Sequence, residues 1–397
     1  MIKYRFMSGF PAHTALKSVM ISHMEELELT PAQLNCLQPD EYQIIDIRDE
    51  YAFEYGHIPG AMNVPHGVLK EKAEDFSREK LLILCCKSGQ ISLEIARELK
   101  ETGFNVCSLK GGYYAWLRNR PGSADKAEKA EQSIRRTFHA QLWSRFVKAI
   151  REYNLVEPND KIAVCISGGK DSMLMAKLFQ ELKRHRKFEF ELVFLVMDPG
   201  YSHENREIIE MNAETLSVPI TIFESNIFES VYNIEKSPCY ICARMRRGYL
   251  YRHAQELGCN KIALGHHYDD VIETVLMGML YSGQFRTMMP KLKSLNFPGM
   301  ELIRPMYFIR EADIIRWRNF NDLHFIQCAC RFTDTCSACG AGITGSKRAE
   351  TKRLIEELKK TNPQVESNIF HSTENVNTET VIAYKDAGGV HNFLDEY

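Results

Sequence analysis

The sequence lacks a long hydrophobic run and lacks an excess of charge of one sign. No apolar stretch in its 397 residues approaches the roughly 18 that a membrane-spanning helix needs, so we expect neither a helical membrane protein nor a membrane partner. The N-terminus carries a few cations but no apolar core of the kind that makes a signal peptide. The formal net charge is −2, so any contact with a nucleic acid must come from local basic patches.

Internal repeats and low-complexity tracts are also absent, and 44% hydrophobic and 26% charged residues are ordinary for a globular protein. The length suffices for two or three domains. Because the 12 cysteines occur without an export signal, they favour thiol chemistry or metal binding over disulfides, and they predict a cytoplasmic protein. Residues 1–25 are predicted to be an N-terminal extension, since Met20 and Met24 follow the first methionine.

Turn residues and mixed charges interrupt the apolar periodicity at residues 121–131. This segment is predicted to link a domain of residues 26–120 to a domain of residues 132–397 that includes a C-terminal extension. Strands are expected at 42–46, 80–85, 104–109, 161–166, 191–197, 220–223 and 261–264. Helical patterns alternate with them, which predicts the α/β class, with a doubly wound parallel sheet in the second domain. Ligands of such sheets bind beyond the carboxyl ends of the strands.

Cys86 lies where the apolar run 80–85 meets the start of a helical pattern, in the loop Cys-Lys-Ser-Gly-Gln-Ile-Ser (86–92). Backbone N–H groups and a helix N-terminus at such a junction favour an anion, and therefore a thiolate or a persulfide. The alternative is a buried cysteine at the end of a strand, without a chemical role. Cys85 fits this alternative better than Cys86 does.

Residues 26–119 resemble the rhodanese family. Beside the Cys86 loop, the matching segments are Asp-Ile-Arg-Asp (46–49), Gly-His-Ile-Pro-Gly-Ala (56–61) and Leu-Lys-Gly-Gly (109–112) followed by Trp116. The resemblance implies a small α/β domain in which Cys86 forms the persulfide. Active rhodaneses usually have an arginine late in the loop where this chain has Ile91, which weakens the grip on thiosulfate. We therefore expect a protein persulfide donor, such as a cysteine desulfurase; the alternative is a catalytically silent domain that binds a partner.

A second ligand loop follows the apolar run 162–166. It consists of Ser167, Gly168, Gly169, Lys170, Asp171 and Ser172. The glycines let the backbone approach a ligand, Lys170 adds positive charge and the hydroxyls cap a helix, which together predict a nest for phosphate oxygens. The loop is not the G-x-x-x-x-G-K-[ST] motif. It resembles the PP-loop of the ATP pyrophosphatases, a fold similar to that of the adenine nucleotide alpha hydrolases, whose members split ATP between the α- and β-phosphates.

Two further segments are candidates for nucleotide and metal contacts. Asp198 ends the run 191–197, where it either contacts the ribose or adenine or forms the turn before Pro199. The segment that begins at Gly265 ends in Asp269 and Asp270, whose paired carboxylates can hold Mg²⁺ or act as acid and base. The histidines between them, His266 and His267, are either ligands or side chains packed beside the nucleotide.

A C-x-x-C pair, Cys239 and Cys242, precedes a helical pattern that contains Arg246 and Arg247. Taken alone, such a pair can be redox-active, half of a zinc site or part of an iron–sulfur site. Four more cysteines follow late in the chain, at Cys328, Cys330, Cys336 and Cys339. A zinc site built from both C-x-x-C pairs is therefore an alternative.

Residues 135–370 resemble the tRNA 2-thiocytidine synthetases. The matching segments are the 167–172 loop, 239–242 with 244–248, 265–270, 281–283 with 290–292, and 325–328. The resemblance implies ATP, Mg²⁺ and tRNA as ligands, and a 4Fe–4S cluster held by Cys239, Cys242 and Cys328. A C-x-C replaces the second C-x-x-C that is usual in the family, so Cys330 is the other candidate for the third ligand.

The predicted reaction is the ATP-dependent thiolation of a tRNA base. The base carbonyl oxygen attacks the α-phosphate while Lys170 and Mg²⁺ stabilise the developing charge, with Asp270 or Asp269 as metal ligand or base. Cys86 is the predicted upstream sulfur carrier. Arg246 and Arg247 either contact phosphate or RNA, or form a solvated helix face.

RNA contacts are expected from residues 281–318, where seven Lys and Arg face three acidic residues, and from a basic helix at 347–360. Tyr281, Phe285 and Trp317 either stack on unpaired bases there or belong to the core. A homodimer is compatible with the sequence. Two other functions compete: a PP-loop ligase for a small molecule, which needs neither cluster nor RNA, and a sulfur-relay protein without catalysis.

Overall fold

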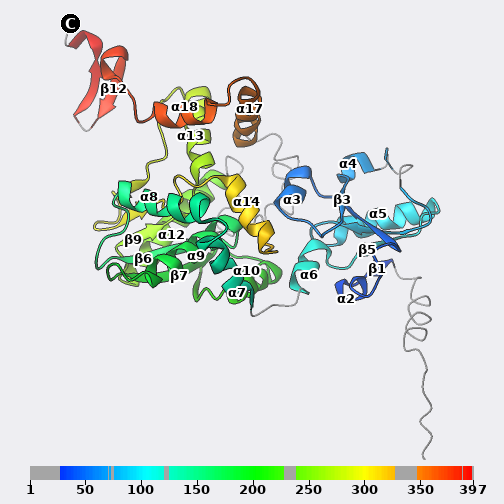
Figure 1. Ribbon diagram of the computed structural model, residues 1–397. Helices are drawn as coiled ribbons and strands as arrows, with labels where there is room; N and C mark the ends of the chain where they lie inside the picture. The colour runs from blue at the N-terminus through cyan, green and yellow to red at the C-terminus, as the bar shows by residue number, and fades with distance from the viewer. Residues whose placement is uncertain are drawn as a thin grey trace, which may run out of the picture. The chain divides into compact units, whose positions relative to one another are not determined.

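The computed structural model describes residues 27–69, 71–72, 76–119, 125–227, 238–326, 347–386 and 388–395, so the predicted extension 1–25 lies outside the described residues. The chain divides into two compact units, Met1–Pro121 and Gly122–Tyr397 (Figure 1). Each unit contains its own sheet, and the prediction of an α/β protein is confirmed. All seven strands expected from the sequence are present, with ends within two residues of the expected ones.

The first unit contains a parallel sheet of five strands in the order β1-β5-β4-β2-β3. Its strands are β1 (Glu28–Leu29), β2 (Tyr42–Asp46), β3 (Met62–Asn63), β4 (Leu81–Cys85) and β5 (Val106–Leu109). Its helices are α2 (Pro31–Leu34), α3 (Glu50–Tyr55), α4 (His66–Leu69), α5 (Gln90–Glu101) and α6 (Gly112–Arg118). The central strand β4 is an unbroken apolar run because both of its faces are buried. Cys86 therefore follows the carboxyl end of a central strand.

The second unit contains a sheet of six strands in the order β10-β11-β9-β6-β7-β8, parallel except for β10. Its strands are β6 (Lys161–Ile166), β7 (Glu191–Asp198), β8 (Ile220–Glu224), β9 (Lys261–Ala263), β10 (Lys291–Lys293) and β11 (Glu301–Ile303). Its main helices are α8 (Ser144–Glu152), α9 (Lys170–Arg184), α10 (His203–Thr215), α12 (Pro238–Glu256), α13 (Tyr268–Ser282) and α14 (Glu311–Phe320). A π-helical turn, η2 (His139–Trp143), precedes α8.

Helices cover both faces of this second sheet. Ala163 and Cys165 of β6 pack with Tyr251 and Ala254 of α12 in one buried cluster. Because side chains alternate along a strand, Val164 points to the opposite face. The chain runs from β6 outward to β7 and β8 and then returns to the other side of β6 as β9. The carboxyl ends of β6 and β9 thus form the switch point at which doubly wound sheets bind ligands.

The predicted linker 121–131 is wrong over most of its length, because the chain forms helix α7 (Asp125–Arg135) there; residues 121–124 lie outside the described residues. The buried side of α7 consists of Ala127, Ala130, Ser133 and Ile134. These positions recur every three or four residues, the period of a helix, but alanine and serine give only a weak hydrophobic signal. Trp317 of α14 packs on this side and donates its indole N–H to the carbonyl oxygen of Ala130. The segment is therefore part of the second unit.

The chain ends in two helices and a hairpin. Helices α17 (Lys347–Thr361) and α18 (Val365–Ser372) both contact α13. Beyond them, the 3₁₀ turn η4 (Thr378–Thr380) leads to the hairpin of β12 (Ala383–Asp386) and β13 (Gly389–Asn392), followed by η5 (Phe393–Asp395) (Figure 1). Among the described residues, no helix is both long and apolar enough to cross a membrane.

The buried ammonium group of Lys177 joins α9 to α7 and should matter for stability. Its Nζ donates to Glu131 Oε1 at 2.7 Å and to the Leu216 carbonyl oxygen at 2.8 Å, with the side chain fully buried. We expect Lys177→Ala to lower the free energy of unfolding of the second unit by about 3 kcal/mol, because it leaves a cavity, removes the ion pair with Glu131 and leaves the buried Leu216 carbonyl oxygen without this donor.

Urea unfolding followed by tryptophan fluorescence measures this loss, in a Trp116→Phe background so that only Trp143 and Trp317 of the second unit report. Lys183→Ala on the exposed side of α9 is the control and should change the free energy by less than about 0.5 kcal/mol. Equal stabilities of the two variants would contradict the role given to Lys177.

Candidate functional site

The Cys86 thiol lies at the centre of a ring of donors in the loop between β4 and α5. Its Sγ accepts hydrogen bonds from the backbone N–H groups of Gly89 at 3.1 Å and Ser92 at 3.4 Å, and from the Ser92 hydroxyl at 3.2 Å. Ser92 is itself fixed by the Ser108 hydroxyl, 2.8 Å away. Because α5 begins at Gln90, the positive end of its dipole also points to the sulfur. This arrangement stabilises a sulfur anion.

The neighbouring Cys85 differs in every respect that matters for reactivity. It is fully buried, and its thiol donates to the Cys86 carbonyl oxygen at 3.5 Å. Burial, assisted by the carboxylate of Asp46, raises the pKa of Cys85 well above its usual value. Cys85 therefore stays a protonated thiol, as the sequence suggested for a buried cysteine at the end of a strand.

The shape of the Cys86 loop depends on two glycines. A Cβ atom at Gly112, where φ is +60°, would lie 2.4 Å from the Cys86 carbonyl oxygen, and one at Gly89, where φ is +89°, would lie 2.7 Å from the amide nitrogen of Gly111. Only glycine accepts both the left-handed backbone and the close approach. Ile91, at the position where rhodaneses usually carry arginine, is 49% exposed and has no charge to offer an anion.

In the second unit, the segment Ser167–Ser172 forms a compact turn between β6 and α9. The Ser172 hydroxyl accepts from the Ser167 N–H at 3.1 Å and donates to the Gly169 carbonyl oxygen at 3.0 Å. Gly168 has a φ of +84°, and a Cβ atom there would lie 2.5 Å from Ile209. The turn places backbone N–H groups and the start of a 15-residue helix at the switch point of the sheet, as a phosphate site requires.

Lys170 is buried in this turn and held between two carboxylates. Its Nζ lies 3.0 Å from Asp171 Oδ1 and 3.1 Å from Glu311 Oε1, and only 4% of its side chain is exposed. Glu311 begins α14, and the sequence did not identify it as a site residue. Burial alone would raise the pKa of Glu311, but Lys170, His267 and Lys352 outweigh it and lower the pKa to about 2.

The two predicted carboxylates after β9 lie beside this pair. Asp269 accepts the Glu311 N–H at 2.7 Å and pairs with Arg310 at 3.1 Å. Asp270 accepts the His267 N–H at 3.0 Å, which caps α13, and pairs with Arg348 of α17. Burial opposes the charge of Asp270, but His267, His266 and Arg348 hold its pKa well below the usual range. Asp270 is therefore charged at neutral pH.

Gly265 and the two histidines complete this edge. A Cβ atom at Gly265 would lie 3.3 Å from the Ser172 amide nitrogen, so glycine lets the loop after β9 pack closely on the phosphate loop. Burial lowers the pKa of His266 to about 4, and its buried Nδ1 has no hydrogen-bond partner in the described part of the chain. His267 titrates the other way: burial opposes its charge, but Asp270, Asp171 and Glu311 raise its pKa. A buried polar atom left open beside a phosphate loop fits a nucleotide or a hydrated metal ion.

Asp198 ends β7 at the same edge of the sheet. Its Oδ1 accepts from the N–H groups of Gly200 at 2.8 Å and Tyr201 at 2.6 Å, and its Oδ2 lies 3.4 Å from Arg206. The carboxylate thus forms the turn that the sequence left open as the alternative. A role in nucleotide contact stays a prediction.

The predicted cluster ligands lie outside the described residues, except for the backbone of Cys239 and Cys242 at the start of α12. The six described cysteines are free, at Cys36, Cys85, Cys86, Cys107, Cys165 and Cys259. Within the described ranges, no group of three His, Cys, Asp or Glu residues is arranged to hold a metal. Arg246 of α12 donates to the Tyr201 hydroxyl at 3.2 Å, which brings α12 to the carboxyl edge of the sheet, whereas Arg247 is exposed.

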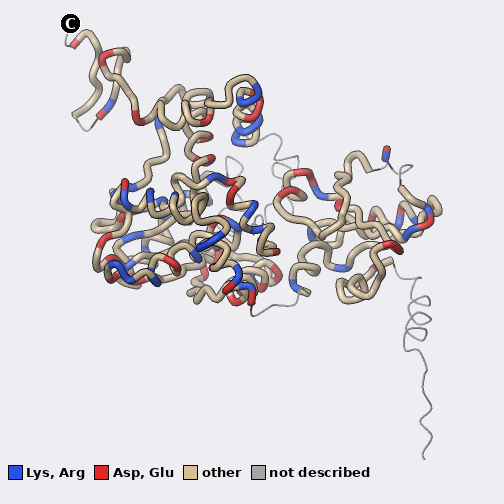
Figure 2. The backbone as a smooth tube through the Cα atoms, in the orientation of Figure 1, with Lys and Arg blue, Asp and Glu red and all other residues tan. Residues whose placement is uncertain are grey.

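Burial removes some members of the RNA-binding patch predicted at residues 281–318 and confirms the alternative for Trp317, which belongs to the core. Trp317 is fully buried, and Arg304 and Arg318 are 7% and 6% exposed. Arg310, Arg316 and Lys291 are engaged in ion pairs with carboxylates. A count of charges along the sequence cannot distinguish cations that neutralise buried acids from cations that face solvent. Figure 2 shows Lys and Arg along α17 instead, where the sequence also predicted a basic helix.

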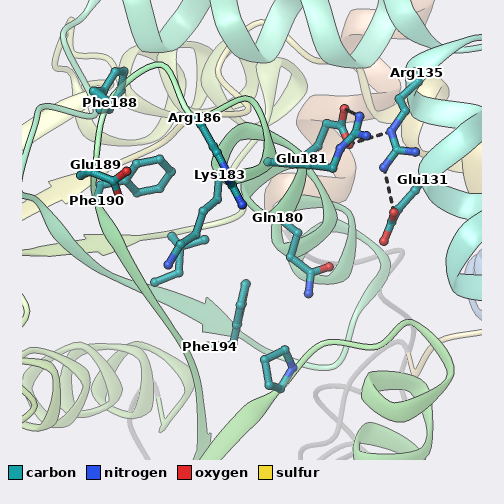
Figure 3. A pocket seen from close by; sticks show the side chains of 13 residues that line it. Glu131, Arg135, Gln180, Glu181, Lys183, Arg186, Phe188, Glu189, Phe190 and Phe194 are labelled. Carbon is teal, nitrogen blue, oxygen red and sulfur yellow. Dashed lines mark hydrogen bonds and ion pairs between the residues drawn. The ribbon is translucent and has the colours of Figure 1, made fainter.

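A hollow of the described surface lies at the far end of α9, away from the phosphate loop. Figure 3 shows it between Phe188, Phe190 and Phe194 on one side and Arg135 with Glu181 on the other. Arg135 pairs there with Glu181 at 2.8 Å. A helix of 15 residues is about 22 Å long, so this hollow, which lies at the C-terminal end of α9, is remote from Lys170 at its start.

Comparisons with known proteins match each of the two units to a domain family. Residues 30–119 match the rhodanese-like domain and residues 138–330 match the PP-loop domain. The chain is 39% identical over 183 residues to a tRNA-cytidine(32) 2-sulfurtransferase of Neisseria meningitidis, an alignment that covers 45% of this chain and 57% of the relative. It is 35% identical over 249 residues to the same enzyme of Anaeromyxobacter dehalogenans, covering 62% of this chain and 82% of the relative.

Two solved structures are similar in part. The U34-tRNA thiolase NcsA from Methanococcus maripaludis with its [4Fe-4S] cluster is 20% identical, with a TM-score of 0.45 over 72% of this chain and 88% of that chain. A rhodanese-related protein from Thermoplasma volcanium is 25% identical, with a TM-score of 0.23 over 24% of this chain and 94% of that chain. The two sulfurtransferases are more similar to this chain in sequence, at 39% and 35% identity, than the two solved structures are, at 20% and 25%. On their evidence, the chain belongs to the tRNA-cytidine(32) 2-sulfurtransferase family and carries a rhodanese-like domain ahead of its PP-loop domain.

Proposed function

We propose that this protein thiolates a cytidine of tRNA, using ATP to activate the base carbonyl and the Cys86 persulfide as a source of sulfur. The main support is the geometry at the switch point of the second sheet, where Lys170, Asp269 and Asp270 surround the phosphate loop. The relatives named for 2-sulfurtransfer to tRNA cytidine are aligned across this loop. A ligase for a small molecule would use the same loop, so the substrate must be tested directly.

In the proposed reaction the phosphate loop binds the departing pyrophosphate. Backbone N–H groups of Gly168 and Gly169 and the ammonium of Lys170 would stabilise the charge that develops there. Asp270, which is ionised and lies at the start of α13, is the proposed ligand of Mg²⁺, with Asp269 as the second carboxylate. We also propose that Asp171 and Ser172 position the loop, that Asp198 and Gly265 border the nucleotide, and that Arg246 and Arg247 contact the RNA backbone.

For the iron–sulfur cluster we propose Cys239, Cys242 and Cys328 as ligands, with Cys330 as the other candidate for the third. Two thiolates three residues apart at a helix start are a suitable donor pair for iron. Held by these three thiolates, a cluster would supply a binding position for the incoming sulfur. Arg246 is one turn from Cys242, and its contact with Tyr201 supports a location for the pair near the edge where ATP would bind.

Sulfur delivery is the proposed task of the rhodanese-like domain, with two equivalents of an external thiol reducing the Cys86 persulfide to the Cys86 thiol, a disulfide and the sulfide that enters the base. The donors around Cys86 Sγ suit a persulfide anion, and Ile91 gives no cation for thiosulfate. We therefore propose a cysteine desulfurase or another persulfide protein as the donor. Fusion to the PP-loop domain would raise the effective concentration of the carried sulfur.

The substrate is tested by mass spectrometry of tRNA nucleosides. Cells that lack this chain should lose 2-thiocytidine while other thiolated nucleosides persist. The wild-type gene should restore it, whereas Lys170→Ala should lower it about a hundredfold because the charge at the leaving group is lost. An unchanged level of 2-thiocytidine in the deletion strain would exclude the proposed substrate.

The sulfur route is tested with Cys86→Ser. With a cysteine desulfurase and cysteine as the source, this variant should carry no persulfide, and its thiolation rate should fall about a hundredfold since delivery becomes bimolecular. With inorganic sulfide as the source, its rate should equal that of the wild type. Cys85→Ser is the matched control and should keep the persulfide. Equal rates of both variants with the desulfurase would argue for a silent rhodanese-like domain.

The cluster is tested with Cys239→Ala. We expect the anaerobically purified variant to lose its iron and its thiolation activity, because one of the proposed thiolate ligands is gone, while its Kd for ATP changes less than about threefold. Cys36→Ala, at an exposed cysteine of the first unit, is the control. Full thiolation by iron-free Cys239→Ala protein would remove the cluster from the mechanism.

A further inference from the structure

Two cations of α17 reach the carboxylates that surround Lys170. We propose that α17 is a phosphate clamp whose Arg348 and Lys352 leave these carboxylates and bind the β- and γ-phosphates when Mg-ATP enters the phosphate loop. The proposal deepens the proposed function, since it takes ATP as the nucleotide. The sequence indicated only a basic helix here, with RNA as its expected partner and no role for any single residue.

The geometry connects both cations to the phosphate loop. Lys352 Nζ lies 3.0 Å from Glu311 Oε2, while the other oxygen of the same carboxylate lies 3.1 Å from Lys170 Nζ. Glu311 thus bridges the loop lysine and α17. Arg348 pairs with Asp270, the proposed Mg²⁺ ligand, and its Nη1 lies 3.3 Å from Glu273 Oε2. Both cations are therefore within one side chain of the groups that would meet the nucleotide.

The buried face of α17 holds the helix in place and carries both cations beside it. Thr351 is fully buried, Ile355 is 4% exposed, and the helix contacts α13. Arg348, Thr351, Lys352 and Ile355 follow one another at the spacing of a single helix face. Lys359 at its end pairs with Glu366 of α18 at 2.9 Å. The side chains of Arg348 and Lys352 are 46% and 41% exposed, on flexible stems one helical turn apart. The two charged groups can therefore change partners while the backbone of α17 stays where it is.

Competition for the carboxylates gives the reason for the exchange. In the structure Arg348 lies beside Asp270 and Glu273, and Lys170 and Lys352 share Glu311. Mg²⁺ would compete with Arg348 for Asp270, because both bind the same carboxylate. The incoming phosphates would repel Glu311 and attract Lys352. A more highly charged anion is thus offered to both cations, and charge-assisted hydrogen bonds to phosphate are strong.

The burial of Glu273 supports the same exchange. Burial raises the pKa of Glu273 to about 7 although Arg348 lowers it, so at neutral pH this carboxyl is half protonated even with the guanidinium beside it. It holds Arg348 less firmly than an ordinary carboxylate would. In the passive alternative, α17 only masks the carboxylates, and removing its cations would tighten nucleotide binding. The clamp predicts weaker nucleotide binding when these cations are removed, and the passive role predicts tighter binding.

Isothermal titration with α,β-methylene-ATP and Mg²⁺ measures this sign on the full chain, since this analogue cannot be split between its α- and β-phosphates. We expect Arg348→Gln and Lys352→Gln each to raise the Kd about tenfold and the double variant to raise it about a hundredfold, through lost charge-assisted contacts. The Kd for AMP, which lacks the clamped phosphates, should change less than about twofold. Arg348→Lys should recover part of the affinity because it restores the charge without the planar fork.

Lys360→Gln is the matched control, since Lys360 lies on α17 but pairs with Glu357 of the same helix. Thermal melting confirms that each variant is folded. Unchanged or tighter binding of the analogue by folded Arg348→Gln and Lys352→Gln would overturn the clamp. The proposed function is tested separately. If the wild-type protein binds the analogue through these cations but the tRNA of its cells contains no 2-thiocytidine, the clamp stands and the proposed substrate is wrong. A wild type that binds no nucleotide overturns both.

Discussion

The buried ammonium of Lys170 is the constraint on which the candidate site depends. A cation with only 4% of its side chain exposed must be neutralised, since an unpaired buried charge costs several kcal/mol. The chain supplies Asp171 from the same helix and Glu311 from the start of α14, and Glu311 in turn donates its N–H to Asp269. Charge compensation thus gathers segments that are 140 residues apart in the sequence around one phosphate loop.

Both units contain the same local arrangement of strand, turn and helix, one around the Cys86 sulfur and one in the phosphate loop. In each, a buried central strand ends in a glycine-containing turn that opens a helix, so that backbone N–H groups converge beyond the carboxyl end of the strand. In the first unit this point holds the Cys86 sulfur, and in the second it forms the phosphate loop. The proposed reaction needs both a sulfur anion and a site for the departing pyrophosphate. Because backbone N–H groups converge in the same way in both motifs, similar strand–turn–helix segments can suit both anions.

The wrong predictions have a common physical cause. Trp317 and Arg318 were candidates for an RNA surface, but α14 packs on α7 and buries them. Residues 121–131 read as a linker because the buried face of α7 is made of alanine and serine, whose small side chains hardly differ from solvent-facing residues in hydrophobicity. In both cases the burial comes from a partner element distant in the chain. A hydropathy pattern along the sequence does not show which distant element will cover a given face.

The sequence by itself determined the α/β class, seven of the strands and the two strand–turn–helix segments that contain Cys86 and Lys170, because a strand, its turn and the next helix are adjacent in the chain and their hydrogen bonds are local. Cys86 and Lys170 could be found for the same reason. Only the tertiary structure decided that Glu311, Arg310, Arg348 and Lys352 belong to the site. Their positions follow from the packing of α14 and α17 near the carboxyl edge of the sheet. That packing depends on long-range burial and charge pairing, which leave no pattern in the sequence.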